Sequence, residues 1–324
     1  MKTTINKPKL LVASPFHTTL LDTLHSNFSI TYIPNAKKID IDSIIDQYEC
    51  IIIATKPGLD QTILSKAHKL KMIIRLGIGI DHINIEYCRE HNIIVAITPN
   101  SNISPVLELV FSKLVYVLRN FDKATNNLFS GHFRDHLENG TELNSKTIGV
   151  IGTGRIGSNI CRLASLFGMK VLAYDPYITN RSEIQALFVE KDVLISQSDI
   201  ITIHTPHTLE TDNMVDFDFL ELMKKDSILI NTARGRIAPM KTLIEYSKKE
   251  KIKNFIIDVY DNEPFIPDND DIFFLRKYFT LSPHIGAFTE QSLHNRSQEA
   301  LIQLNDYFIK SKQPHGMIDL LKGY

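Results

Sequence analysis

Short apolar runs alternate with amphipathic segments along the first third of the chain. The runs cover residues 9–13, 30–33, 50–54, 72–76 and 93–96, and their apolar character is continuous rather than alternating. Continuous apolar character is typical of strands buried on both faces, as in a parallel sheet covered by helices. We therefore expect the chain to begin with an α/β domain.

A second series of elements follows. A helical pattern at 106–119 is introduced by Ser104 as an N-cap and by Pro105 in the first turn. The polar segment 120–145 has no sustained period and predicts a long connection. Strands are predicted at 147–151, 170–174, 200–204, 227–231, 254–260 and 279–281, and a long helix at 290–310. A length of 324 residues is typical of about two domains.

Residues 146–175 contain the parts of a dinucleotide-binding βαβ unit. An apolar strand runs into Gly152-x-Gly154-x-x-Gly157, a helical pattern follows, and a second strand ends in Asp175. Gly152 permits a tight turn, Gly154 lets the backbone approach a pyrophosphate, and Gly157 lets helix and strand pack closely. The free N–H groups and the positive dipole end of the helix would face the phosphates.

The cofactor expected from this unit is NAD. Arg155 and Ile156 lie in the first turn of the predicted helix and belong to the same binding set. Asp175 can accept hydrogen bonds from the adenosine ribose hydroxyls, and its charge would repel the 2′-phosphate of NADP. The alternative, a glycine turn that only packs a helix on a strand, leaves Asp175 unexplained.

Composition narrows the class of protein. With 43% hydrophobic residues, 23% charged residues and a formal net charge of −1, the chain is an ordinary globular protein. Nothing in this balance favours nucleic acid or an anionic membrane. Cys50, Cys88 and Cys161 are far apart and form no CxxC motif, which fits a reducing cytoplasm. The N-terminal apolar run is too short for a signal peptide, and no run is long enough to cross a bilayer.

Three further motifs lie at or just beyond the C-terminal ends of predicted strands, where open parallel sheets bind ligands. Arg234 follows the strand at 227–231, Glu263 lies in Asp258-Val-Tyr-Asp-Asn-Glu-Pro264, and His284 lies in Ser282-Pro-His-Ile-Gly286. The planar fork of an arginine matches a carboxylate. A histidine exchanges protons near neutral pH, and a neighbouring carboxylate favours its charged form.

In this order the motifs resemble the D-isomer-specific 2-hydroxyacid dehydrogenase family. The resemblance covers nearly the whole chain and includes RLGIGIDHIN (75–84), HTPHTLET (204–211) and SPHIGAFTE (282–290). It implies two doubly wound parallel-sheet α/β domains with a cleft between them. Residues 101–286 would form a Rossmann-type NAD-binding domain, and residues 1–100 and 287–324 a flavodoxin-like substrate-binding domain. A homodimer is implied as well.

The resemblance also implies roles for single residues. Arg234 would bind the substrate carboxylate and polarise its 2-oxo group, His284 would exchange the proton, and Glu263 would pair with His284. Asp258 and the backbone of Ala233 would bind the nicotinamide amide. Thr205, Pro206 and Thr211 would line the cofactor pocket. The backbone N–H groups of Gly77 and Ile78 would bind the substrate carboxylate.

Lys56 follows the predicted strand at 50–54 and so would also lie at a ligand-binding edge. It is either a site for a second anionic group of the substrate or a solvated loop charge. His132 and His136 are spaced like metal ligands, but no third ligand motif accompanies them, so no metal site is expected. His82 and His207 differ from the residues more usual in the family, which leaves details of the substrate open.

The expected activity is NAD-dependent hydride transfer between a 2-oxo acid and a D-2-hydroxy acid. The natural 2-oxo acid is not determined, because specificity depends on loop geometry. Two alternatives retain the fold: an NAD(H)-sensing binding protein of the corepressor type, and a phosphite dehydrogenase. Neither nucleic acid nor membrane is an expected partner.

Overall fold

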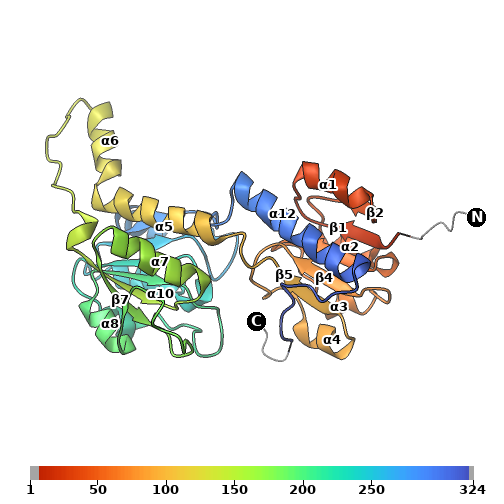
Figure 1. Ribbon diagram of the computed structural model, residues 1–324. Helices are drawn as coiled ribbons and strands as arrows, with labels where there is room; N and C mark the ends of the chain where they lie inside the picture. The colour runs from red at the N-terminus through yellow and green to blue at the C-terminus, as the bar shows by residue number, and fades with distance from the viewer. Residues whose placement is uncertain (1–6, 321–324) are drawn as a thin grey trace, which may run out of the picture. The chain divides into compact units, whose positions relative to one another are not determined.

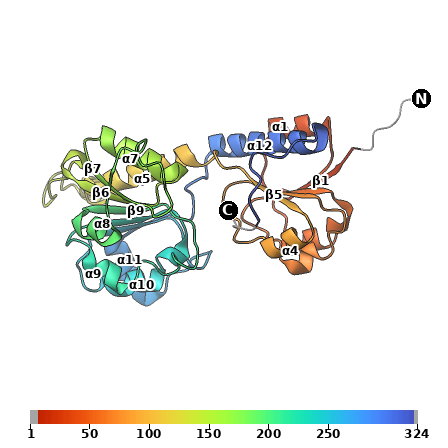
Figure 2. The same ribbon diagram turned by 60° about the horizontal axis from the view of Figure 1, so that its bottom comes forward.

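The computed structural model describes residues 7–320. The chain divides into two compact units, shown in Figures 1 and 2. Unit 1 consists of Met1–Asn102 and Phe288–Tyr324, and unit 2 of Ile103–Ala287. Each unit is built on one parallel sheet with helices on both faces, so the predicted α/β class with two parallel sheets is confirmed.

The sheet of unit 1 has five strands in the order β2-β1-β3-β4-β5. They are β1 (Lys9–Val12), β2 (Ser29–Tyr32), β3 (Cys50–Ile53), β4 (Met72–Arg75) and β5 (Ile94–Ile97). All neighbours are parallel, with Leu11 opposite Ile51 and Ile51 opposite Ile73. The order reverses between β1 and β3, which is the flavodoxin-like arrangement.

Alternate residues of this sheet enter two separate cores. One face, with Leu11 and Ile51, packs against α2 (Lys38–Asp42), α3 (Gln61–Leu64) and α4 (Ile85–Glu90). The other face, with Leu10 and Ile52, packs against α1 (Thr18–His25) and α12 (Glu290–Leu304). Figure 2 shows α1 and α12 on the opposite side of the sheet from α4. Burial on both faces explains why β1, β3 and β4 are mainly apolar, whereas the edge strand β2 is partly exposed.

The sheet of unit 2 has seven parallel strands in the order β12-β11-β10-β9-β6-β7-β8. They are β6 (Thr147–Ile151), β7 (Lys170–Tyr174), β8 (Leu187–Phe188), β9 (Ile200–Ile203), β10 (Ile228–Asn231), β11 (Asn254–Ile257) and β12 (Phe279–Leu281). The order reverses between β6 and β9, so the loops after these two strands flank a crevice at the carboxyl edge, where such sheets bind ligands.

Helices cover both faces of this sheet too. One core contains α8 (Lys191–Gln197), α9 (Phe217–Leu222), α10 (Met240–Ser247) and α11 (Ile272–Tyr278). The other contains α5 (Ile103–Leu118) and α7 (Arg155–Leu166). The remaining turns are the 3-10 helices Ile45–Gln47, Leu143–Ser145, Gly235–Ile237 and Asn269–Asp271, and the π-helical turn Asn305–Ile309 that ends α12.

The structure corrects several sequence predictions. α5 begins at Ile103, so Ser104 is inside the helix and is not its N-cap; Pro105 still lies in the first turn, where its missing N–H costs no bond. The segment predicted as a connection contains α6 (Phe121–Phe129), which was missed because α6 buries no residue. The short strand β8 was also missed. The helix predicted at 290–310 changes to a π-helical turn after Leu304.

Candidate active site

The glycine-rich loop joins β6 to α7. Gly152 has a φ of +86°, and a Cβ there would lie 2.8 Å from the carbonyl carbon of His204, which explains the absence of a side chain. A Cβ on Gly157 would lie 1.9 Å from the Gly152 oxygen, so close packing of helix and loop also requires glycine. A Cβ on Gly154 would meet no atom within 4 Å, so the space above this residue is open.

The start of α7 presents unpaired backbone donors to that open space. Gly154 is the N-cap and offers no side chain, so the amides of the first turn, at Arg155, Ile156 and Gly157, lack the usual capping acceptor. α7 has 12 residues, enough for an appreciable dipole. This combination suits a phosphate group.

Asp175 follows β7 and is tied to the glycine-rich loop. Its Oδ2 accepts from the backbone N (2.7 Å) and Oγ1 (3.2 Å) of Thr153, and its Oδ1 accepts from the backbone N of Tyr177 at 3.0 Å. The side chain is partly exposed. An ionised carboxylate has about four acceptor positions, so one remains for a ligand hydroxyl without loss of these bonds.

The loop after β9 carries Thr205, Pro206 and Thr211. The Oγ1 of Thr205 is buried and has no partner among the described residues, which marks it as a polar atom that a bound ligand would satisfy. Thr211 Oγ1 donates to the Pro206 carbonyl at 2.8 Å and so holds the loop closed. His204 precedes them; burial lowers the pKa of its imidazole to about 3, and the ring bonds Thr202 Oγ1 at 2.8 Å.

His207 belongs to a charged cluster at the end of the same loop. Its Nε2 lies 2.7 Å from Asp212, which also pairs with Arg236. The hydrogen bond from His207 and the charge of Arg236 lower the pKa of Asp212. The cluster connects the loop after β9 to the turn that carries Arg234, so in this structure His207 has a structural partner.

Arg234 lies in the turn after β10, and two features shape this turn. Asn231 is fully buried; its Nδ2 donates to the Arg234 carbonyl at 2.9 Å, and its Oδ1 accepts from the Ala233 amide at 3.0 Å. A Cβ on Gly235 would lie 1.8 Å from the carbonyl carbon of Tyr260, so the turn lies directly on the chain after β11. Because residue 235 is a glycine, the turn can approach the segment that contains Glu263, and Arg234 lies near that segment.

The guanidinium of Arg234 is partly buried, and its Nη1 donates to the Ala233 carbonyl at 2.7 Å. Ala233 was expected to bind the nicotinamide amide through its backbone. Its N–H is engaged by Asn231, and its carbonyl retains one further acceptor position.

Glu263 and His284 are in direct contact. His284 Nδ1 lies 2.9 Å from both carboxylate oxygens of Glu263. The tautomer that donates from Nδ1 to the carboxylate leaves Nε2 for another partner. The Oε1 of Glu263 also accepts from the backbone N of Tyr260 at 3.2 Å. β10, β11 and β12 are neighbours in the sheet, so Arg234, Glu263 and His284 follow three adjacent strands.

The turn that carries His284 is held by Asp258. His284 has a left-handed backbone, with φ 53°. Asp258, 1% exposed, accepts from the amides of Ile285 (3.0 Å) and Gly286 (2.8 Å) and from the hydroxyl of Ser282. Asp258 was expected to bind the nicotinamide amide; three of its about four acceptor positions are used within the protein.

The predicted residues of unit 1 lie at the carboxyl edge of its own sheet. Gly77, with φ +128°, donates its N–H to Thr98 Oγ1 at 2.6 Å, so the predicted clamp on a substrate carboxylate cannot use this donor while that bond is made. The Ile78 amide has no hydrogen bond to the described residues. Lys56 is exposed in the loop after β3, and His82 Nε2 bonds the Ala54 carbonyl at the start of that loop (2.7 Å).

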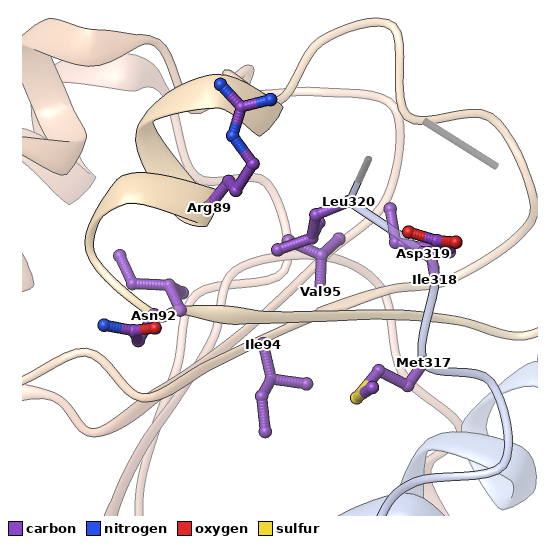
Figure 3. Close-up of a pocket in the computed structure, with 9 residues that line it drawn as sticks. Arg89, Asn92, Ile94, Val95, Met317, Ile318, Asp319 and Leu320 are labelled. Atoms are coloured by element: carbon purple, nitrogen blue, oxygen red, sulfur yellow. The ribbon is translucent and has the colours of Figure 1, made fainter. Parts of the chain in front are cut away.

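A hollow of about 540 Å³ lies elsewhere in unit 1. It is bounded by α4, β5 and the segment 317–320, and its lining is mainly apolar, as Figure 3 shows. None of the predicted site residues lines it. His132 and His136 are exposed. In residues 7–320 no three potential metal ligands are grouped together, and no helix has the length and apolar character needed to span a membrane.

Sequence reasoning missed the residues that hold the site in shape. Asn231, Ser282 and Thr98 are buried polar residues at strand ends, and Lys113 is a lysine among the apolar positions of α5. A polar residue at the end of an apolar strand, or within the apolar stripe of a helix, was the available signal. Their partners lie far away in the sequence, so the bonds themselves could not be deduced.

A parallel sheet with a glycine-rich loop at its switch point and an acid after the next strand defines a dinucleotide-binding domain. Residues 111–286 match the model of the NAD binding domain of the D-isomer specific 2-hydroxyacid dehydrogenases. The chain therefore belongs to this family, and the cofactor of the domain is NAD.

Relatives agree with this assignment. The chain is 32% identical to D-3-phosphoglycerate dehydrogenase of Methanocaldococcus jannaschii over 287 residues, 88% of this chain and 54% of that protein. It is 31% identical to hydroxypyruvate reductase of Thermotoga maritima, covering 79% of this chain and 83% of that protein. The chain thus spans about half the length of the D-3-phosphoglycerate dehydrogenases that it matches.

Among solved structures, D-lactate dehydrogenase from Aquifex aeolicus, complexed with NAD and lactic acid, has a TM-score of 0.83 and 27% identity. The match covers 94% of this chain and 98% of that chain.

Proposed function

We propose that this chain is an NAD-dependent D-2-hydroxyacid dehydrogenase that interconverts a 2-oxo acid and a D-2-hydroxy acid. The observation that carries the proposal is the pairing of Glu263 with His284 at 2.9 Å, in the segments that follow β11 and β12. These two strands and β10, which leads to Arg234, are consecutive in the sheet. Residues 101–286 would be the NAD-binding domain, and residues 1–100 and 287–324 the substrate-binding domain.

The proposed proton exchange uses the free nitrogen of His284. Glu263 engages Nδ1, fixes the orientation of the ring and stabilises the imidazolium, so Nε2 exchanges a proton with the substrate oxygen. In the reductive direction Nε2–H donates this proton to the 2-oxo oxygen; in the oxidative direction neutral Nε2 takes it from the hydroxyl. NADH, when bound, supplies the hydride to C2 of the 2-oxo acid, and NAD accepts it from C2 of the hydroxy acid.

Arg234 would bind the substrate carboxylate bidentately and polarise the neighbouring 2-oxo group. The bond from Arg234 to Ala233 restricts the rotamers of the guanidinium before the substrate binds, which reduces the entropy lost on binding. From unit 1, the Ile78 amide would donate to the substrate carboxylate. Gly77 could do so only after its bond to Thr98 is released.

The cofactor residues fit NAD. The open space above Gly154 suits a pyrophosphate approached by the backbone, Asp175 retains acceptor capacity for a ribose hydroxyl, and Thr205 Oγ1 lacks a partner within the protein. Pro206 and Thr211 would line the same pocket. Asp258 and the Ala233 carbonyl each retain one acceptor position for the nicotinamide amide.

The test is NADH oxidation with a panel of 2-oxo acids, including hydroxypyruvate, glyoxylate and pyruvate, and with His284→Ala as the inactive control. Turnover of at least one acid by the wild-type protein, lost in the variant, is expected. NADH binding without turnover of any acid would favour an NAD(H)-sensing binding protein. Turnover of phosphite with NAD, and of no 2-oxo acid, would identify a phosphite dehydrogenase.

We further propose that the protein is a homodimer, with α6 in the interface. Leu128 and Phe129 of α6 are 62% and 87% exposed, and none of the nine residues of this helix is buried within the chain. Figure 1 shows α6 projecting from unit 2. A helix with large exposed apolar side chains and no core of its own is expected to be covered by a partner.

A further inference from the structure

One lysine lies where the pattern of its helix calls for an apolar residue. α5 packs on the sheet of unit 2 through buried residues that include Val106 and Val110. Lys113 continues this stripe at the next turn, since positions 106, 110 and 113 follow the i, i+4, i+7 spacing of one helical face. Its partly buried side chain reaches the carboxyl edge of the sheet, where Nζ lies 2.6 Å from Ser282 Oγ.

The chemistry of this contact fixes the direction of each hydrogen bond. An ammonium only donates, so the Ser282 hydroxyl accepts from Lys113. The hydroxyl proton is then donated to Oδ1 of Asp258. The same carboxylate accepts from the backbone amides of Ile285 and Gly286. A chain of bonds thus runs from α5, through Ser282 and Asp258, to both residues that follow His284.

The chain also connects opposite charges inside the protein. Asp258 is 1% exposed. Burial lowers the pKa of the Lys113 ammonium to about 8, while the charge of Asp258 raises it. A buried carboxylate without a nearby positive charge is costly, so removal of the Lys113 charge would leave Asp258 less well compensated. A leucine or methionine at position 113 would fill the helix–sheet contact without this electrostatic cost, so packing alone does not explain the lysine.

The turn that these bonds hold has a strained conformation. His284 has a φ of 53°, in the left-handed region that residues with a Cβ adopt uncommonly and at some cost in backbone energy. Tyr260 adds a further restraint, because its hydroxyl donates to the Ser282 carbonyl at 2.9 Å. Lys113 therefore restrains the turn from α5, and Asp258 and Tyr260 restrain it from the segment after β11.

We propose that Lys113 is a positioning residue for His284: through Ser282 and Asp258 it holds the turn after β12 so that the imidazole keeps its place beside Glu263. This inference rests on the proposed function, in which His284 exchanges the proton. Lys113 acts through other residues and does not itself touch the substrate.

A double-mutant cycle tests the route. Lys113→Met and Ser282→Ala should each lower kcat about tenfold, with little change in the KM for NADH, because misplacement of a reacting group slows the chemical step. If Lys113 acts through Ser282, the double variant should lose about as much as either single variant. A roughly 100-fold loss, the product of the two effects, would show that Lys113 acts by another route. Ser282→Thr, which keeps the hydroxyl, should retain most of the activity.

Hydrogen exchange supplies a readout that does not depend on turnover. In Lys113→Met the amides of Ile285 and Gly286 should exchange at least about tenfold faster, while those of the β9 and β10 core strands remain protected. Unchanged exchange at these two amides would overturn the proposal. The control is Lys225→Met, at an exposed lysine with no bond to this turn.

The two proposals fail in distinguishable ways. If wild-type protein reduces no 2-oxo acid, the proposed function fails, yet the exchange experiment still reports whether Lys113 holds the turn. If 2-oxo acids are turned over but Lys113→Met behaves like Lys225→Met, only the inference about Lys113 fails. Should Lys113→Met not fold, Ser282→Ala carries the exchange measurement alone.

Discussion

The bonds around His284 show how single residues prepare this site. A left-handed backbone costs a residue with a Cβ about 1 kcal/mol or more. Here the amides of Ile285 and Gly286 donate to Asp258 and hold the backbone of the turn, while Glu263 holds the imidazole. The backbone strain is located at the residue to which we assign proton exchange, where pre-organisation lowers the entropy lost on reaching the transition state.

Asp175→Ala should relax the preference for NADH over NADPH. Loss of the carboxylate removes an acceptor for the ribose hydroxyls and the repulsion of a 2′-phosphate, so the ratio of kcat/KM values should fall about tenfold or more, which is about 1.4 kcal/mol. Steady-state kinetics with both cofactors measure it. Asp192→Ala, at an exposed aspartate on α8, is the matched control. Equal use of the two cofactors by the wild-type protein would refute the assignment.

Arg234→Lys should lose far more activity than its retained charge suggests. An ammonium cannot reproduce a planar bidentate clamp, so kcat/KM should fall on the order of 10²-fold, about 3 kcal/mol of transition-state stabilisation. Arg236→Lys, two residues along, is the control, since that arginine is exposed and pairs with Asp212. Near-normal turnover by a folded Arg234→Lys variant would remove Arg234 from the site.

Lys56→Ala should discriminate between classes of substrate. If Lys56 binds a distal phosphate or carboxylate, the variant should raise KM for acids with two anionic groups about tenfold and leave glyoxylate and pyruvate unaffected. Lys66→Ala removes another charge of unit 1, one paired with Asp42, and serves as the control. Equal effects on both classes of acid would assign Lys56 to the solvated surface.

At the scale of elements, glycines set how closely turns and strands approach. Gly235→Ala should separate the Arg234 turn from the chain after β11, because the new Cβ would lie 1.8 Å from a backbone carbon. Overpacking of this kind costs about 1–3 kcal/mol. Urea denaturation and kcat/KM should therefore both report a loss.

Gly154→Ala provides the contrast for this prediction. Its Cβ would meet no protein atom within 4 Å, so stability should be unchanged while the KM for NADH rises. If both variants had the same midpoint of urea unfolding as the wild-type protein, the close approach at Gly235 would not be a structural requirement.

For the whole molecule, the testable property is the oligomeric state. Leu128→Asp and Phe129→Asp should convert a dimer to monomers, because they place charges in an apolar interface. Sedimentation velocity measures the change. Ile39→Asp, at a 73% exposed residue of unit 1, should leave the mass unaffected. A wild-type protein that sediments as a monomer would contradict the proposal, and α6 would then be an exposed helix.

Local pattern was enough to predict both sheets and the cofactor motif. Strands buried on both faces are mainly apolar, and β6 and β7 begin and end where the sequence predicted. Gly152, Gly157 and Asp175 are recognisable because backbone geometry and phosphate chemistry permit few alternatives at those positions. Arg234, Glu263 and His284 were identified by type and order, and their pairing remained an expectation.

Only the tertiary structure determined which polar groups are hydrogen-bond partners. The hydroxyl of Thr98 accepts a hydrogen bond from the Gly77 amide, and Asp258 accepts from an amide of the turn that carries His284. Lys113 donates to Ser282, which is 169 residues away in the sequence. α6 was missed although Phe121, Ala124 and Leu128 follow helical spacing, because the segment is short and mostly polar. Periodicity records which face of an element is buried, but it does not record which polar groups the fold brings within hydrogen-bond distance.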